Sequence, residues 1–176
     1  MSADRPVHIA FLRAVNVGGT GKLPMAELRD MCEALGFDDV RTYIQSGNVV
    51  LRSEADASLV RSLLEDALRE RFGKRVAVHV RSPDQLASIL DRTPFTSAAP
   101  NRVLVSLLDG PAPDGVDGTL GAAGEEVHAS GHEVFVHYPE GQGRSKLRLR
   151  LGDDATARNL NTVRKVLDLG RAAAAS

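Results

Sequence analysis

The sequence predicts an α+β protein made of two related ferredoxin-like subdomains (βαββα), each with an antiparallel sheet. The first half has the element order β-α-β-β-α-β, which is the split βαβ pattern of ferredoxin-like folds. A Ser46-Gly47 turn in this half is echoed by Ser130-Gly131 in the second. We therefore expect one subdomain over residues 1–81 and a second over 82–176 that carries basic C-terminal helices. A chance echo is the competing explanation, since Ser-Gly turns are common.

The elements of the first half follow from periodicity and from their end signals. Apolar runs and β-branched alternation predict strands, and the Ser46-Gly47 turn joins two of them as a hairpin. Pro24 suits the first turn of a helix that Gly36 ends, and Gly73 ends a second, amphipathic helix. The expected strands are residues 7–13, 40–45, 48–52 and 75–80, and the expected helices are residues 24–35 and 57–72.

The second half is predicted with a short helix, a strand, a hairpin and helical sequence at its end. Residues 83–91 have an apolar helical stripe, and residues 102–108 form an apolar run typical of a strand. Residues 111–124 are rich in Gly and Pro and favour at best a poor helix. Residues 125–138 read as the second hairpin, and helical sequence is expected from residue 144 onward.

Composition and charge exclude several classes of protein. The net charge of −1 gives no global field that would attract nucleic acid or membrane, so such binding needs a local patch. No apolar run approaches the ~20 residues of a membrane span, and the N-terminus lacks the features of a signal peptide. The single Cys32 lies on a helical stripe and fits a buried thiol in a reducing compartment. We expect a cytoplasmic protein without a membrane partner and without a cofactor.

The opening loop, residues 13–22, is rich in glycine but matches no nucleotide motif. A P-loop alignment places Asn16 at the first glycine and Leu23 at the Mg²⁺-binding hydroxyl, so both ends fail. The dinucleotide template fails because Pro24 stands at its third glycine. Free N–H groups before a helix start can still hold an anion, and a purely structural loop is the alternative.

A basic segment near the C-terminus is the second candidate. Between residues 141 and 165 there are seven basic and two acidic side chains, and Ser145, Asn159 and Asn161 accompany them. Arginine side chains and free N–H groups suit phosphate oxygens. A solvated helical face is the alternative. The three histidines of the second hairpin, His128, His132 and His137, lack a third ligand, so no metal site is expected.

Four stretches of the chain form a recognisable combination: LRAVNVGG, MAELRDMCEALGFDDVRTYIQSGNVV, PEGQGRSKL and TARNLNTVRKVLDL. Together they resemble a bacterial family of uncharacterised proteins, domain of unknown function 1697, and the resemblance covers nearly the whole chain. It implies a two-subdomain α+β fold and no established activity. The family pattern has Trp where this chain has Leu160. If that Trp stacks on a ligand, the stacking is in doubt here, and if it is a core residue, Leu is an ordinary substitute.

The favoured hypothesis is a protein that binds a phosphate-bearing small molecule or nucleic acid, at one site built from both ends of the chain. A small enzyme at the same site is the alternative, with Lys22 or Lys146 and Asn16 or Asn48 polarising a substrate oxygen. A protein–protein interaction module is the third possibility. The sequence does not decide whether the protein is an enzyme, and it leaves catalytic residues and oligomeric state open. The candidate ligand-binding residues are Arg13, Asn16, Gly18, Gly19, Lys22, Ser46, Asn48, Arg144, Ser145, Lys146, Arg158 and Asn159.

Overall fold

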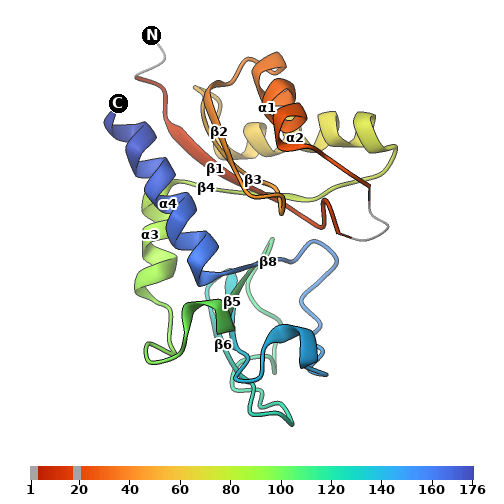
Figure 1. Cartoon of the computed structure of the whole chain (residues 1–176), viewed down its shortest axis with the longest axis vertical. Helices are drawn as coiled ribbons and strands as arrows, with labels where there is room; N and C mark the ends of the chain where they lie inside the picture. The colour runs from red at the N-terminus through yellow and green to blue at the C-terminus, as the bar shows by residue number, and fades with distance from the viewer. Residues whose placement is uncertain (1–3, 18–20) are drawn as a thin grey trace. The chain divides into compact units, whose positions relative to one another are not determined.

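The computed structural model describes residues 4–17 and 21–176 (Figure 1). Helices and strands are mixed along the chain, and the strands form two four-stranded antiparallel sheets. This arrangement confirms the α+β class predicted from the sequence. The chain divides into a first unit, Met1–Ala87 with Lys165–Ser176, and a second unit, Ser88–Arg164. The sequence-based division after residue 81 assigned the whole C-terminal helix to the second part, whereas the compact units share it.

The first unit has the element order expected from the sequence. Its strands pair antiparallel in the order β2-β3-β1-β4. Both helices lie between strands along the chain, α1 after β1 and α2 after β3. The elements are β1 (Val7–Leu12), α1 (Met25–Ala34), β2 (Asp38–Tyr43), β3 (Asn48–Arg52), α2 (Ala57–Phe72) and β4 (Val78–Arg81).

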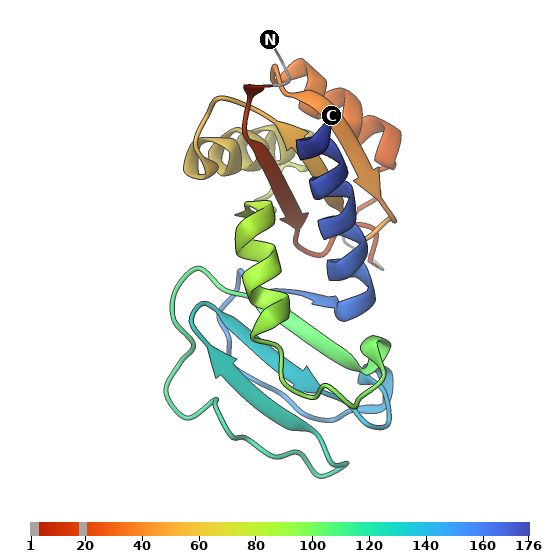
Figure 2. The same cartoon turned by 90° about the vertical axis from the view of Figure 1, so that its left-hand side faces the viewer.

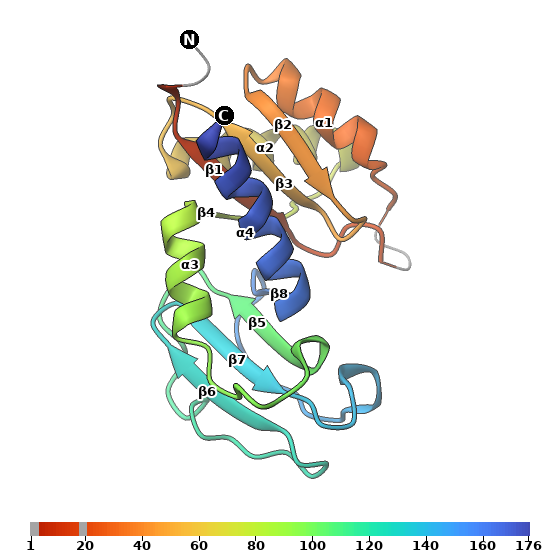
Figure 3. The same ribbon diagram turned by 60° about the vertical axis from the view of Figure 1, so that its left-hand side comes forward.

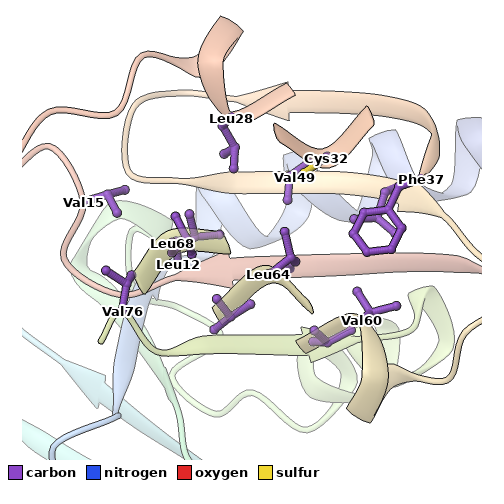
Figure 4. Close-up of a cluster of buried hydrophobic side chains, with 14 of the residues drawn as sticks. Leu12, Val15, Leu28, Cys32, Phe37, Val49, Val60, Leu64, Leu68 and Val76 are labelled. Atoms are coloured by element: carbon purple, nitrogen blue, oxygen red, sulfur yellow. The ribbon is translucent and has the colours of Figure 1, made fainter. Parts of the chain in front are cut away.

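The core of the first unit lies between the sheet and the two helices α1 and α2 (Figure 4). Asp56 caps the start of helix α2, since its carboxylate accepts from the Leu59 N–H at 2.8 Å, and the buried residues of α2 are Val60, Leu64 and Leu68. Leu63 and Phe72 are half-buried and pack against the edge of this core. Burial raises the pKa of the Cys32 thiol to about 12, with Glu33 adding to the shift, so this thiol is an inert core group.

The last turns of helix α4 (Leu160–Ala175) cover the other face of the first sheet, beside β1 (Figure 2). The close approach is at Gly170, where a Cβ atom would lie 2.9 Å from Ile9 Cδ1. The Arg52 guanidinium, 4% exposed, donates to the carbonyls of Ala173 and of Arg5. A cation suits the carbonyl end of a helix, so Arg52 fixes the end of α4 to this sheet.

The second unit repeats the strand order of the first with different coverings. Its strands pair antiparallel in the order β6-β7-β5-β8, and β6, β7 and β5 lie side by side in Figure 3. Helix α3 (Pro83–Asp91), which begins at the end of the first unit, agrees with its predicted range. The strands are β5 (Val103–Leu107), β6 (Glu126–Ser130), β7 (Glu133–His137) and β8 (Thr156–Asn159).

The prediction of helical sequence from residue 144 was wrong up to residue 159 and is confirmed from Leu160 onward, where α4 begins. Between the short 3-10 helix η3 (Gln142–Arg144) and α4, residues 145–151 belong to no helix or strand and are alternately half-buried and exposed, as in an extended chain. Leu147, Leu149 and Leu151 pack against the hydrophobic cluster of the second sheet, and the residues between them are exposed. Strict alternation of apolar and charged residues is the pattern of an extended chain, which explains the difference.

No helix among the described residues is long and apolar enough to cross a membrane.

Candidate functional site

The candidate ligand-binding residues fall in both units of the chain. Five of them belong to the first unit and five to the second, and Gly18 and Gly19 lie outside the described residues. A single pocket made from both ends of the chain stays a prediction. The first-unit residues are Arg13, Asn16, Lys22, Ser46 and Asn48, and the second-unit residues are Arg144, Ser145, Lys146, Arg158 and Asn159.

The Asn16 side chain braces the opening loop. Its Nδ2 donates to the carbonyls of Leu23 and Gln45, both at 2.8 Å, and its Oδ1 accepts from the Leu23 N–H at 2.7 Å. Both amide hydrogens therefore bind backbone carbonyls within the first unit. Asn16 joins the loop to the start of α1 and to the β2–β3 turn, and it has no amide hydrogen left for a substrate oxygen.

The β2–β3 turn is packed just as closely against the same loop. Asn48, fully buried, donates through Nδ2 to the Tyr43 carbonyl and to Ser46 Oγ, both at 2.9 Å. Gly47 has φ +88°, and a Cβ there would lie 2.7 Å from Val15 Cγ2. Ser46 and Asn48 therefore form part of a tightly built turn, whose geometry requires glycine between them.

The two candidate cations of the first unit, Arg13 and Lys22, lie outside this packed turn. Arg13 and Lys22 are exposed, and the Lys22 carbonyl accepts from Arg71 Nη2 at 3.4 Å. Arg71 also pairs with Glu27, which raises the pKa of the arginine, and its guanidinium lies 5.0 Å from the centre of the Phe72 ring. These contacts tie the start of α1 to the end of α2.

A pocket of about 450 Å³ lies within the second unit. Two segments form it, one before β6 and the other running from the end of η3 onward, and the cationic residues of its wall are all exposed. No aromatic side chain belongs to this wall among the described residues. The lining residues are Leu120, Gly121, Ala122, Ala123, Glu125, Arg144, Lys146, Leu147 and Arg148.

Glu125 holds the two walls of this pocket together. It is 3% exposed, its Oε1 accepts from Ser145 Oγ at 2.8 Å, and its Oε2 accepts from the Ala123 N–H at 2.9 Å. Hydrogen bonds from its own backbone N–H and from Ser145 lower the pKa of Glu125. A Cβ at Gly121 would overlap this carboxylate. The ionised Glu125 is therefore a built part of the pocket.

The sequence analysis did not identify Glu125 as a candidate site residue. The usable signal was its place directly after the Gly-Ala-Ala-Gly turn of residues 121–124, where backbone N–H groups are available to a carboxylate. Tyr138 is close enough to Glu125 and Arg148 for their charges to affect its pKa. Burial and the negative charge of Glu125 raise its pKa, and Arg148 opposes this shift, so its hydroxyl is protonated at neutral pH.

Arg158 and Asn159 lie at the end of β8, where Arg158 is buried and Asn159 caps the following helix. Arg158 is 8% exposed, and burial lowers its pKa to about 10, which leaves it charged at neutral pH. Asn159 Oδ1 accepts from the Thr162 N–H at 2.9 Å, which makes it the N-cap of α4. Leu160 is 4% exposed, as expected for a core substitute rather than a stacking residue.

The histidines of the second hairpin lie apart from the pocket lining. His128 is 3.4 Å from Asp117 and stacks on Phe135 with ring centres 6.3 Å apart, and His137 is 5.6 Å from the Phe95 ring. Within the described part of the chain, no three His, Cys, Asp or Glu side chains gather as metal ligands would.

Comparison with known proteins places the chain in a family. A family model for proteins of unknown function, DUF1697, matches residues 6–135. The chain belongs to this family. Its fold is similar to that of a conserved bacterial protein, SP0830 from Streptococcus pneumoniae, with a TM-score of 0.72 and 18% sequence identity. That match covers 95% of this chain and 99% of the other. A comparison with curated proteins gave no match.

Proposed function

We propose that this DUF1697 protein binds a phosphate-bearing ligand, a nucleotide or a nucleic acid, in the pocket of its second unit. The observation that carries the proposal is a pocket of about 450 Å³ whose wall holds Arg144, Lys146 and Arg148, while its only described carboxylate, Glu125, is already hydrogen-bonded through both oxygens. Arg144 and Lys146 have no ion pair among the described residues. They are the direct phosphate contacts in this proposal.

The electrostatics of the pocket support an anionic ligand. Three cations on one small wall repel each other, and no second carboxylate of the described chain lines the pocket to offset them. Arginine offers a planar fork of donors to phosphate oxygens, and lysine adds a compact charge. The volume is within the range of about 300–1,000 Å³ that is typical of small-molecule sites.

The position of Ser145 supports the same assignment of roles. Its hydroxyl donates to Glu125 and also accepts from the Leu147 N–H at 3.1 Å, so it fixes the backbone that carries Arg144 and Lys146. Ser145 is therefore a positioning residue in the proposal. Because the amide hydrogens of Asn16 and Asn48 bind groups of their own unit, the enzyme alternative lacks the amide donors that it invoked.

The test is a titration of inorganic phosphate, mononucleotides and short oligonucleotides against the full chain and a Arg144→Gln/Lys146→Gln variant. A charge-assisted contact contributes about 1.5 kcal/mol or more, so the variant should bind roughly a hundredfold more weakly. Arg29→Gln is the matched control, since Arg29 is an exposed arginine of α1 in the first unit. If the wild type binds none of the probes, or the double variant binds as well as wild type, the proposal is wrong and an interaction module takes its place.

A further inference from the structure

The extended segment that follows the pocket carries a row of cations. Lys146, Arg148 and Arg150 are exposed, and the leucines between and after them pack against the hydrophobic cluster of the second sheet. Alternate residues of an extended chain lie on the same side, about 6.6 Å apart. The three cations therefore form one row along residues 146–150. Its first two members line the pocket, and Arg150 lies beyond the lining residues.

This row is not neutralised within the described chain. None of the three side chains has an ion pair there, and Arg148 donates only to carbonyls of its own segment, to Leu147 at 2.9 Å and to Ser145 at 3.4 Å. The backbone N–H groups of residues 148–152 also have no hydrogen-bond partner among the described residues. The segment therefore offers a ligand both a row of positive charges and backbone N–H groups that can donate hydrogen bonds.

A single phosphate group accounts for the pocket but not for Arg150. A ligand that uses the whole row must itself be a chain with a regular repeat of negative charge. The spacing of the row matches the scale of the phosphate repeat along an extended single strand of nucleic acid. The wall of the pocket has no described aromatic residue, so the contacts are to the sugar-phosphate backbone and not to stacked bases.

We infer that the ligand is single-stranded nucleic acid, bound through its backbone along residues 144–150 without base specificity. The inference rests on the proposed function, because its first phosphate occupies the same pocket. Arg144 and Lys146 bind that phosphate, and Arg148 and Arg150 bind the following ones. Since the cations follow one another along one segment, the strand runs along that segment.

The experiment measures binding of labelled dT8, of dTMP, of an eight-base-pair duplex and of polyglutamate to the full chain by fluorescence anisotropy or calorimetry. Each phosphate contact on a single strand adds about 0.7 to the slope of log affinity against log salt. We expect a slope of about −2 to −3 for dT8 and a markedly smaller one for dTMP. Arg150→Gln should reduce the dT8 slope by about 0.7 and its affinity about fivefold at 0.1 M salt.

The controls separate this inference from the proposed function. Arg150→Gln should leave dTMP binding unchanged, Lys146→Gln should weaken dTMP and dT8 alike, and Arg29→Gln should change neither. If dTMP binds through Lys146 but dT8 binds no tighter and ignores Arg150→Gln, the inference is wrong and the proposed function stands. Duplex or polyglutamate binding equal to that of dT8 also overturns the inference. If no phosphate probe binds, both fall.

Discussion

The two sheets of the molecule have the same strand order, but helices cover the first sheet and irregular segments cover the second. Numbered from its own first strand, each sheet has the order 2-3-1-4 with every pair antiparallel. In the first unit, α1 follows the first strand and α2 follows the third. In the second unit the equivalent connections are residues 108–125 and 138–155, which contain no α-helix. The Ser46-Gly47 and Ser130-Gly131 turns occupy the same place, between the second and third strands.

The difference explains why the candidate site lies in the second unit. A helix presents a side chain to the same face only every third or fourth residue, whereas an extended segment presents every second one. Residues 146–151 thereby pack three half-buried leucines against the hydrophobic cluster and expose three cations in one short stretch. In the first unit, the helices that connect the strands pack against the core. In the second unit, the connecting segments pack against the core and also line the pocket.

The largest expected effect tests whether helix α2, which covers the first sheet, and residues 146–151, which cover the second, contribute equally to stability. Leu64 of α2 is fully buried, and Leu64→Ala should lower the free energy of unfolding by about 2–5 kcal/mol. Leu149 of the extended segment is half-buried, and Leu149→Ala should cost about 1 kcal/mol. Urea or guanidinium titration measures both. Equal losses of unfolding free energy would show that the extended segment packs as firmly as the helix. A loss below about half a kcal/mol for Leu64→Ala would show that the buried face of α2 is exposed to solvent instead.

The next prediction compares the two hairpin turns. At Gly47, φ is +88° and a Cβ would lie 2.7 Å from Val15, so Gly47→Ala should cost about 2–4 kcal/mol through strain and overlap. At Gly131, φ is +61° and the nearest atom is the end of the Arg92 side chain at 3.7 Å. Gly131→Ala should therefore cost only about 1 kcal/mol from backbone strain. Similar losses at the two turns would contradict this account of the Val15 contact.

Much of this fold was predictable from local patterns. The bounds of α2 and α3 agree with the predicted ranges, because Asp56, Pro83 and Gly73 are strong end signals. The helix expected directly after residue 144 was wrong, because Leu147, Leu149 and Leu151 alternate with charged residues, which is the pattern of an extended chain. The coverings of the second sheet could not be predicted, since a Gly- and Pro-rich connection has no periodicity to read.

Less of the candidate site was predictable, because it depends on contacts between distant residues. The sequence pointed to Arg144, Ser145 and Lys146 as a basic, polar turn, and these residues do line or support the pocket of the second unit. It gave no indication that Glu125, twenty residues earlier, accepts from Ser145. Asn16 and Asn48 attracted interest as amides near a glycine-rich loop, but their partners are backbone and side-chain groups of their own unit.

A smaller effect is expected at two helix starts. Asp56 caps α2 through the Leu59 N–H at 2.8 Å, and Asn159 caps α4 through the Thr162 N–H at 2.9 Å. Replacement of either by Ala should cost about 1 kcal/mol in denaturant titration. Asn159→Ser retains a capping oxygen and should restore most of the loss. If Asn159→Ser is stable but binds phosphate probes more weakly than wild type, Asn159 also contacts the ligand.

The smallest expected effect concerns pH and the pocket. The pKa of Glu125 is lowered in the folded protein, so the unfolded chain takes up this proton at a higher pH. The stability that Glu125 contributes is therefore complete above the ordinary glutamate pKa of about 4.3 and is lost as the pH falls through its folded value. Glu126→Gln is the matched control, because Glu126 is the adjacent, exposed carboxylate at the start of β6.

The measurement is the unfolding midpoint of wild type, Glu125→Gln and Glu126→Gln between pH 7 and pH 3. Wild type should exceed Glu125→Gln at neutral pH and approach it in acid, while Glu126→Gln should follow wild type throughout. Amide exchange should quicken first at residues 121–125 and 145–147, because the bonds from Ser145 and Ala123 to Glu125 join these two segments of the second unit. A gap between wild type and Glu125→Gln that stays constant across this range would show that the carboxylate charge does not hold the pocket together. The irregular coverings of the second sheet would then depend on leucine packing alone, as the helices of the first depend on theirs.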